Sequence, residues 1–435
     1  MTNSLRPYAP VSTKIEDDGV LSIGGCKVTD LAKEFGTPLY VMDEQTIVDY
    51  ANKYLSNFSK LYPDYLPIYA SKALSNVAII KLIHSLGFGI DVVSGGELFT
   101  ALKAGVNPSK IYFHGNNKSK EELEYALKSK IGRIVVDNTY ELNLLNELSK
   151  QYKQTVEIMF RITPEIDAHT HDFIKTGHID SKFGFYKKNL IEVAKSTLEM
   201  PYLKLIGIHS HIGSQIFDTA PFKEAANILM KYMHKIQEEA GIILKEINVG
   251  GGLGIYYTNE DDPQDITNFA PIITQTIKEC AQKYNLPLPK LIIEPGRSMV
   301  ANAGVTLYTI GSQKEIPGIR TYISIDGGMA DNPRPAMYGA KYSADIGNKM
   351  SEKSSQLCTI AGKFCESGDI LIKDIKLQNP KSGDILVVYT TGAYNYSMSS
   401  NYNRFLKPAM VLVKDGKAKL ILKRESYEDL TRNDL

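Results

Sequence analysis

Residues 66–75, LPIYASKALS, carry the pattern that decides the fold. A short apolar segment, Leu66–Ala70, runs into Lys72, and helix-forming sequence follows with Ser75 or Asn76 as the expected N-cap. The pattern predicts a buried β-strand that leads directly into an α-helix. It also raises a question about Lys72, because most lysines lie on the protein surface with only their apolar stems covered.

The same alternation of strand and helix recurs along the chain. The expected strands are Leu66–Ala70, Phe88–Val92, Lys110–His114, Arg133–Asp137, Val156–Ile162, Leu205–His211, Glu246–Val249 and Leu291–Glu294. Eight such units over about 250 residues are typical of a parallel (β/α)8 TIM-like barrel, and an open doubly wound sheet is the alternative.

Start and stop signals mark the predicted helices between these strands. Ser119 with Glu122 three residues later predicts a capping box, and Asn138 with Glu141 is expected to repeat it. Two glycines match the favoured C-terminal signal and are expected to end helices: Gly87 and Gly105.

The pattern changes after the eighth predicted strand. Segments such as RTYISIDGG and SGDILVVYTTGAYNYSM are β-rich, and PAMVLVKDGKAKLILKR contains an Asp-Gly hairpin signal. The N-terminal segment GVLSIGGCKV is also predicted as β. We therefore expect a barrel at residues 40–300 and a second, antiparallel β domain formed by residues 1–39 and 301–435.

Composition excludes several classes of function. The 435 residues include 50 basic and 49 acidic side chains, so nothing indicates a nucleic-acid or acidic membrane partner. We expect no transmembrane helix and no secretory signal, because no long apolar run is present. The cysteines form no CxxC pair, which favours a reducing cytoplasm without disulfides or structural zinc: Cys26, Cys280, Cys358 and Cys365.

In a barrel the chemistry lies at the carboxyl ends of the strands. The residues expected there are Lys72, Asp91, His114, Asp137, Arg161, His211, Gly250, Gly251, Gly252 and Glu294. Strand ends are often polar simply because they leave the core. So many ionisable groups on one face nevertheless predict a site for a charged ligand with several functional groups.

The segment INVGGGLG suggests one part of that ligand. It puts three glycines after the seventh predicted strand, where such barrels commonly bind phosphate, although a tight turn is the plainer interpretation. Ser214 could add a hydroxyl group. A phosphate on the glycines and an amine at Lys72 predict a ligand with a phosphate and a carbonyl, and pyridoxal 5′-phosphate has both.

Two further residues fit such a ligand. Glu294 could keep the ring nitrogen protonated, so that the ring withdraws electrons, and His211 could stack on the ring. The alternatives are a salt bridge from Glu294 to Arg297 and an ordinary buried histidine. A metal centre is the alternative for the pairs HTH (169–171) and HSH (209–211), which put two imidazoles on one face of an extended segment.

At this point the combination of motifs becomes specific. The motifs occur in the order YASKA, DVVSGGEL, FHGNNKS, HIGSQ, VGGGLG, EPGRS, DGGMADNPRPAMYGA, CESGD and GAYNYSMSSNYNR, from Pro38 to Pro408. The chain resembles the type III pyridoxal-phosphate decarboxylases, and within them the branch that acts on meso-2,6-diaminopimelate. The resemblance implies a barrel with a C-terminal β domain, pyridoxal 5′-phosphate as cofactor, and a carboxy-lyase that makes L-lysine and CO2 in the last step of lysine biosynthesis.

The resemblance also implies roles for single residues. Lys72 would form a Schiff base with the cofactor, and Cys365, by base rate a buried thiol, would return a proton to the carbanion. The cofactor would be held by Lys72, Asp91, Arg161, His211, Ser214, Gly250, Gly251, Gly252, Glu294, Gly296, Arg297 and Tyr394. The substrate would contact Arg297, Arg334, Tyr338, Glu366 and Tyr394, with guanidinium groups on carboxylate and Glu366 on the distal ammonium.

In the family, Cys365 and Glu366 would reach into the partner subunit's site, which implies a homodimer with shared active sites. The cysteine usage favours the cytoplasm, and we expect no metal. Two other functions stay open: a sister decarboxylase for another basic amino acid or polyamine precursor, and a catalytically silent homologue that regulates a partner enzyme. CESGD and NPRPAMYG argue against the first. Intact Lys72, Cys365 and glycine residues argue against the second.

Overall fold

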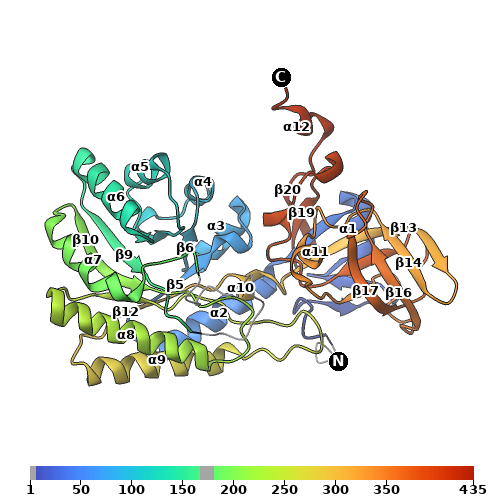
Figure 1. Ribbon diagram of the computed structural model, residues 1–435. Coiled ribbons are helices and arrows are strands. Elements are labelled where there is room, and N and C mark those ends of the chain that lie inside the picture. Colours follow the sequence, from blue (N-terminus) through green and yellow to red (C-terminus); the bar gives the residue numbers. More distant parts are fainter. Residues whose placement is uncertain (1–5, 167–180) are drawn as a thin grey trace. The chain divides into compact units, whose positions relative to one another are not determined.

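The computed structural model describes residues 6–166 and 181–435 (Figure 1). The chain forms two compact units. The barrel unit consists of Tyr50–Gly254 and Pro263–Gly296, and the β unit consists of the chain up to Asp49, Ile255–Asp262 and Arg297–Leu435. The units thus divide at 49/50 and 296/297, whereas the sequence suggested 39/40 and 300/301, and residues 255–262 return to the β unit.

The barrel unit contains the expected closed barrel of parallel strands, which confirms the (β/α)8 prediction. Its strands are β5 (Tyr65–Ala70), β6 (Gly89–Val92), β7 (Ile111–Phe113), β8 (Arg133–Val136), β9 (Val156–Arg161), β10 (Leu203–His209), β11 (Glu246–Asn248) and β12 (Lys290–Ile293). Neighbouring strands pair in sequence order, and β12 closes the circle on β5.

Helices surround these strands within the barrel unit (Figure 1). They are α3 (Val77–Ser85), α4 (Gly95–Lys103), α5 (Lys120–Lys128), α6 (Thr139–Tyr152), α7 (Leu190–Ser196), α8 (Ala220–Ala240) and α9 (Ile266–Lys283), with the short turns η1 (Ser71–Ala73), η2 (Pro108–Lys110), η4 (Lys187–Asn189) and η5 (Thr197–Glu199). One buried apolar cluster joins side chains from five strands: Ile68, Tyr112, Val135, Met159 and Ile292.

Most of the helix signals work as predicted. Asn76 caps α3 by accepting a hydrogen bond from the N–H of Ile79 at 3.0 Å, and Ser119 with Glu122 forms the capping box of α5. Gly87 and Gly105 follow α3 and α4 with φ angles of +106° and +82°, which glycine adopts without strain.

The second predicted capping box is wrong in one half. Asn138 caps α6 by accepting from the N–H of Glu141 at 3.0 Å. The Glu141 carboxylate does not return a bond to Asn138, because it accepts from Lys118 Nζ at 2.7 Å and from the N–H of Asp137 at 3.3 Å. A buried ammonium group therefore takes the carboxylate that the local pattern assigned to the cap.

The β unit is mainly antiparallel. Its larger sheet contains β4 (Leu39–Asp43), β13 (Gly304–Ile316), β14 (Arg320–Ile325), β15 (Ala344–Ile346), β16 (Gln356–Ala361), β17 (Ile370–Leu377), β18 (Ile385–Val388), β19 (Ala409–Lys414) and β20 (Lys417–Leu422). Two pairs, β4 with β19 and β14 with β16, are parallel. Asp415 and Gly416, with φ angles of +49° and +73°, join β19 to β20 as the predicted hairpin.

Smaller elements complete the description. A second sheet joins β1 (Lys14–Ile15), β2 (Leu21–Ile23) and β3 (Cys26–Lys27). The remaining helices are α1 (Val28–Phe35), α2 (Glu44–Leu61), α10 (Arg297–Val300), α11 (Arg334–Tyr338) and α12 (Tyr427–Thr431), with the turns η6 (Tyr396–Met398) and η7 (Tyr402–Arg404). Within the described ranges, none of the helices has the length and apolarity that crossing a membrane requires.

Candidate active site

The carboxyl ends of the barrel strands bring together a group that we call the barrel cluster. Its members are Lys72, Asp91, His114, Arg161, His209, His211 and Glu294. Lys72 lies in η1, directly after β5, and its side chain is exposed. Most of the other members are buried, and His211 is half-buried. Parallel strands end on the same face of a barrel, so residues more than two hundred positions apart become neighbours.

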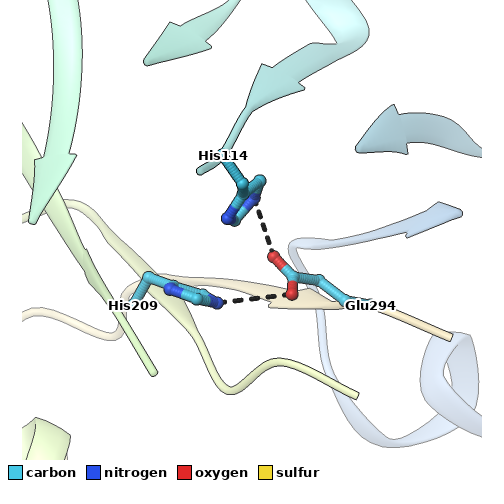
Figure 2. A group of neighbouring side chains, drawn as sticks. All are labelled: His114, His209 and Glu294. Carbon is cyan, nitrogen blue, oxygen red and sulfur yellow. Dashed lines mark hydrogen bonds and ion pairs between the residues drawn. The ribbon is translucent and has the colours of Figure 1, made fainter. Parts of the chain in front are cut away.

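Glu294 is a carboxylate of the barrel cluster with several hydrogen-bond and ion-pair partners. It directly follows β12 and is 7% exposed. Its Oε1 accepts from Asn248 Nδ2 at 2.7 Å. The same Oε1 lies 3.0 Å from His114 Nε2, and Oε2 lies 3.3 Å from His209 Nε2 (Figure 2). Burial alone would raise the pKa of Glu294, but the two imidazoles outweigh it and hold that pKa well below its usual range.

The neighbouring side chains respond to this charge in different ways. Burial raises the pKa of Asp91 to about 7, although His114 opposes the shift. Burial also lowers the pKa of His209 to about 4, so His209 is neutral at physiological pH. In His114 the carboxylates of Asp91 and Glu294 overcome burial and raise the pKa. Of the two imidazoles, His114 therefore has the greater tendency to carry a positive charge.

The three consecutive glycines allow loops to approach closely at the strand ends. A Cβ atom on Gly251 would lie 1.9 Å from the carbonyl oxygen of Glu294, and one on Gly252 would lie 2.2 Å from that of Gly213. Gly250 adopts φ +71° and donates its N–H to Asn248 Oδ1 at 2.9 Å. Close backbone packing thus explains the triplet, whatever else its N–H groups bind.

Several other predicted residues lie near the same strand ends. Ser214 is half-buried in the loop after β10. Arg161, the last residue of β9, packs its guanidinium 4.1 Å from the ring centre of Phe183. Asp137, which follows β8, accepts from the N–H of Gly184 at 3.0 Å. At Gly296 a Cβ atom would approach the Cβ of Ala70 to 3.0 Å, so this turn also packs tightly.

A second group, the arginine cluster, lies in the β unit. It consists of Arg297, Arg334, Tyr257, Tyr338, Tyr342 and Tyr394. Arg297 and Arg334 are both buried, and both pack on the ring of Tyr394, at 4.8 Å and 5.5 Å from its centre. No carboxylate lies among these six residues. Two buried cations among phenol rings are suited to an anionic ligand.

Tyr257 shows how strong the positive field of the arginine cluster is. Its hydroxyl accepts from Arg297, and the guanidinium of Arg334 lies 5.8 Å from its ring centre. Burial would raise the pKa of a phenol, yet the two arginines lower the pKa of Tyr257. An added carboxylate would experience the same attraction.

Cys365 and Glu366 are the predicted proton donor and ammonium contact, and base rates predicted burial for Cys365 alone. Both are exposed, so the expectation that Cys365 is a buried thiol is wrong. The N–H of Cys365 donates to Asn403 Oδ1 at 2.8 Å, which fixes the backbone at this position. The turn CESGD displays the thiol on the surface of the β unit because Phe364 and Asp369 on either side are the buried residues.

Of the two histidine pairs offered as a metal site, only HSH lies within the described residues. Its His209 belongs to a group whose ligand atoms lie close enough together to hold a metal ion: His114, His209 and Glu294. His169 and His171 lie outside the described residues. In the second pair, His209 joins Glu294 and His114, whereas His211 Nδ1 accepts from the N–H of Gly251 at 3.4 Å. The two imidazoles of HSH thus have different partners.

Comparison with known proteins identifies the family. The family profile described as pyridoxal-dependent decarboxylase, pyridoxal binding domain, matches residues 48–301. The chain belongs to the pyridoxal-dependent decarboxylases. It is 49% identical to a diaminopimelate decarboxylase of Bacillus subtilis over 96% of this chain and 95% of the relative, and 48% identical to one of Synechocystis over 98% and 92%.

A solved structure gives the same result for this pyridoxal-dependent decarboxylase. The diaminopimelate decarboxylase of M. jannaschii in complex with L-lysine aligns with a TM-score of 0.92 at 38% identity, covering 99% of this chain and 98% of the other. The fold, the family and pyridoxal phosphate as cofactor are thereby confirmed.

The residues of this decarboxylase fit the cofactor. Lys72 presents an exposed amine, and Glu294 is an ionised carboxylate to pair with a protonated ring nitrogen. Buried polar atoms without a hydrogen-bond partner in the described part of the chain remain at the same strand ends, among them Asp91 Oδ1 and Ser210 Oγ. Such atoms are rare in a finished core and are typical of a site that a polar ligand completes.

Sequence reasoning missed four residues of these clusters: His209, Asn248, Tyr257 and Tyr342. Asn248 precedes the glycine triplet, and its position at a strand end could have identified it. His209 was considered only as a metal ligand. Tyr257 and Tyr342 lie in segments without a recognisable pattern, and only the folded β unit brings them to the arginines.

Proposed function

We propose that this chain removes CO2 from meso-2,6-diaminopimelate and releases L-lysine. The observation that carries the proposal is the pairing of β5 with β12, which puts the accessible amine of Lys72 and the ionised carboxylate of Glu294 at the ends of adjacent strands. Full-length relatives at 44–49% identity that are named diaminopimelate decarboxylase support the choice of substrate.

Each residue then has a task that its chemistry suits. When bound, pyridoxal phosphate supplies an aldehyde that bonds to amines and a ring that withdraws the electron pair left by CO2. Lys72 would hold the cofactor through that aldehyde. Glu294 keeps a proton on the ring nitrogen. The thiol of Cys365 donates a proton to the α-carbon after CO2 leaves, so that the carbon regains a C–H bond.

The substrate has two amino-acid ends, and the proposal assigns its charges to different groups. Arg297 and Arg334 bind a carboxylate, since planar guanidinium groups match carboxylate oxygens. Tyr338 and Tyr394, whose rings pack on Arg334, limit how that carboxylate can turn. Glu366 pairs with the distal ammonium group. A decarboxylase for ornithine or lysine would need only the acidic contact.

We also propose that the active enzyme is a homodimer in the cytoplasm. Cys365 and Glu366 are exposed in the single chain, and a thiol in open water cannot direct its proton to one carbon. A partner surface that covers them would supply the missing enclosure. The four cysteines are free thiols, as a reducing compartment favours.

The first test measures cofactor and substrate together. Wild type and Lys72→Ala are mixed with pyridoxal phosphate in the presence of EDTA, the visible absorbance is recorded, and CO2 is followed after adding meso-diaminopimelate, L-ornithine or L-lysine. We expect a lysine-dependent band and CO2 from meso-diaminopimelate alone. CO2 from another amino acid would support a sister decarboxylase, and a band without CO2 from any of the three would support a silent homologue.

A further inference from the structure

Glu294 is surrounded by more polar side chains than its pairing with the ring nitrogen requires. Three side chains from three different strand ends converge on it: His114 after β7 and His209 at the end of β10, which Figure 2 shows, and Asn248 at the end of β11. All three are at most 3% exposed. A buried carboxylate without partners would take up a proton, because burial disfavours the charged form. The three side chains around Glu294 therefore need an explanation.

The three side chains do not contribute to Glu294 in the same way. Asn248 and His209 are hydrogen-bond donors to Oε1 and Oε2. An ionised carboxylate only accepts, so His209 must carry its proton on Nε2, and its Nδ1 has no partner within the described chain. His114 lies 3.0 Å from Oε1 as an ion pair, and its second carboxylate neighbour is Asp91 at 3.8 Å. His114 therefore contributes mainly charge, and His209 mainly a hydrogen bond.

The two carboxylate oxygens are also used differently. Among the described residues, Oε1 accepts from Asn248 and has the His114 imidazole 3.0 Å away as an ion-pair partner, whereas Oε2 has His209 alone. A carboxylate oxygen accepts about two hydrogen bonds, so Oε2 keeps one direction for a further donor. The proton on a pyridine ring nitrogen is such a donor.

We propose that His114, His209 and Asn248 are positioning residues that hold Glu294 ionised and orient Oε2 toward the cofactor's ring nitrogen, with His114 supplying the charge. The inference rests on the proposed function, because it specifies how Glu294 performs its part there. If the donors are lost, Glu294 binds a proton itself and leaves the ring nitrogen without one. The ring then withdraws electrons less effectively.

Other charges facing this group do not replace His114. Among the described residues, Arg161 at the end of β9 acts on both Asp91 and Glu294, and Lys72 in η1 acts on Asp91. Arg161 is shared with Asp137, and the Lys72 amine becomes bonded to the cofactor. The acidic neighbours, Asp91 and beyond it Glu97, add negative charge. His114 is thus the cation in direct contact with Glu294.

The experiment compares variants that separate charge from hydrogen bonding. His209→Gln keeps an N–H donor at the same reach, and His209→Leu does not. His114→Gln keeps a polar amide at this position but loses the charge. Each holoenzyme is prepared with cofactor labelled with nitrogen-15 at the ring nitrogen, and the NMR shift of that nitrogen reports its protonation. His234→Gln on α8, where the imidazole stacks on Tyr284 4.9 Å away, is the control for losing a histidine.

We expect a protonated ring in wild type, His209→Gln and His234→Gln, and loss of that signal in His114→Gln and His209→Leu. By analogy with residues that orient metal ligands, kcat should fall about tenfold or more in the latter two, with little change in KM. A ring that stays protonated in a folded His114→Gln with wild-type kcat would overturn the proposal. Wild-type protein that does not bind the cofactor would reject the proposed function itself.

Discussion

At the scale of single residues, Asp331 shows how burial controls a charge away from the active site. Its Oδ1 accepts from the N–H of Gly328 at 2.8 Å, and its Oδ2 accepts from the hydroxyl of Tyr308. Burial raises the pKa of Asp331 to about 7. The folded protein therefore binds this proton more tightly than the unfolded chain, and the stability it contributes at low pH is lost as pH rises toward 7.

Asp331→Asn should remove this pH dependence. The amide can still accept from Gly328 and can donate to the Tyr308 oxygen. We expect the free energy of unfolding of the variant to increase relative to that of wild type as pH rises from 5 to 8, because the wild type loses the stability linked to this proton between about pH 4 and pH 7. Urea unfolding at both pH values measures this, with the exposed Asp415→Asn as control. Curves for wild type and variant that run parallel across this range would contradict the assignment.

Lys118 is a second residue whose burial decides how strongly its substitution changes the stability of the protein. Its ammonium is buried, bonds to Glu141 at 2.7 Å and donates to the carbonyl oxygens of Gly115 and Val135. Lys118→Met leaves the Glu141 carboxylate buried without its counter-charge, which should cost about 3 kcal/mol of unfolding free energy or more at pH 7. Burial already raises the pKa of Glu141, and losing Lys118 raises it further.

The loss in Lys118→Met should accordingly be smaller at pH 5 than at pH 8, because protonated Glu141 is neutral and ionised Glu141 is not. The matched control is Lys120→Met, whose exposed ammonium lies 4.0 Å from Glu124. That surface pair should change stability by no more than about 0.5 kcal/mol. Equal losses of unfolding free energy for the two lysine variants in urea would show that the buried Lys118–Glu141 pair stabilises the protein no more than the surface pair does.

At the scale of elements, Glu122 connects two helices. Its Oε2 accepts from the N–H of Ser119 at the start of α5, and its Oε1 accepts from the N–H of Gly95 at the start of α4, at 3.0 Å and 2.8 Å. Ser119→Ala should cost about 1 kcal/mol, the usual value for a lost N-cap. Glu122→Ala should cost about 2 kcal/mol, since it leaves donors at two helix ends unsatisfied.

Glu121→Ala is the control for this comparison, because Glu121 is an exposed acidic residue in the same helical turn. Denaturant unfolding followed by circular dichroism gives the free energies. A Glu122→Ala loss no greater than that of Ser119→Ala would mean that the bond to Gly95 contributes nothing.

At the scale of the whole molecule, the exposed Cys365 makes a prediction about assembly. Lys72→Ala and Cys365→Ala should each be nearly inactive as homodimers. When the two are co-expressed, about half the dimers are mixed, and if Cys365 serves its partner's site, one of the two sites in each has both residues. Activity near about a quarter of the wild-type value would support the shared site. If the co-expressed protein is dimeric by sedimentation but stays inactive, Lys72 and Cys365 of one active site must come from the same chain.

The sequence by itself determined the barrel and the ends of its strands. Alternating apolar strands and capped helices are local signals, and eight of them in a row leave little choice of topology. Lys72, Asp91 and Glu294 followed as strand-end residues because a parallel barrel has only one face for its carboxyl ends. The Asp-Gly hairpin and the cap at Asn76 were predicted for the same reason: a few consecutive residues contain the whole interaction.

Tertiary structure alone decided which side chains meet. His114, His209, Asn248 and Glu294 come from four strand ends, and no local pattern relates them until the barrel closes. The Glu141 carboxylate bonds to Lys118 and not to the predicted cap at Asn138, and the local sequence pattern does not include this contact. The thiol of Cys365 is exposed because its turn buries the neighbouring residues instead. Contacts between distant segments depend on packing, which periodicity and residue type do not encode.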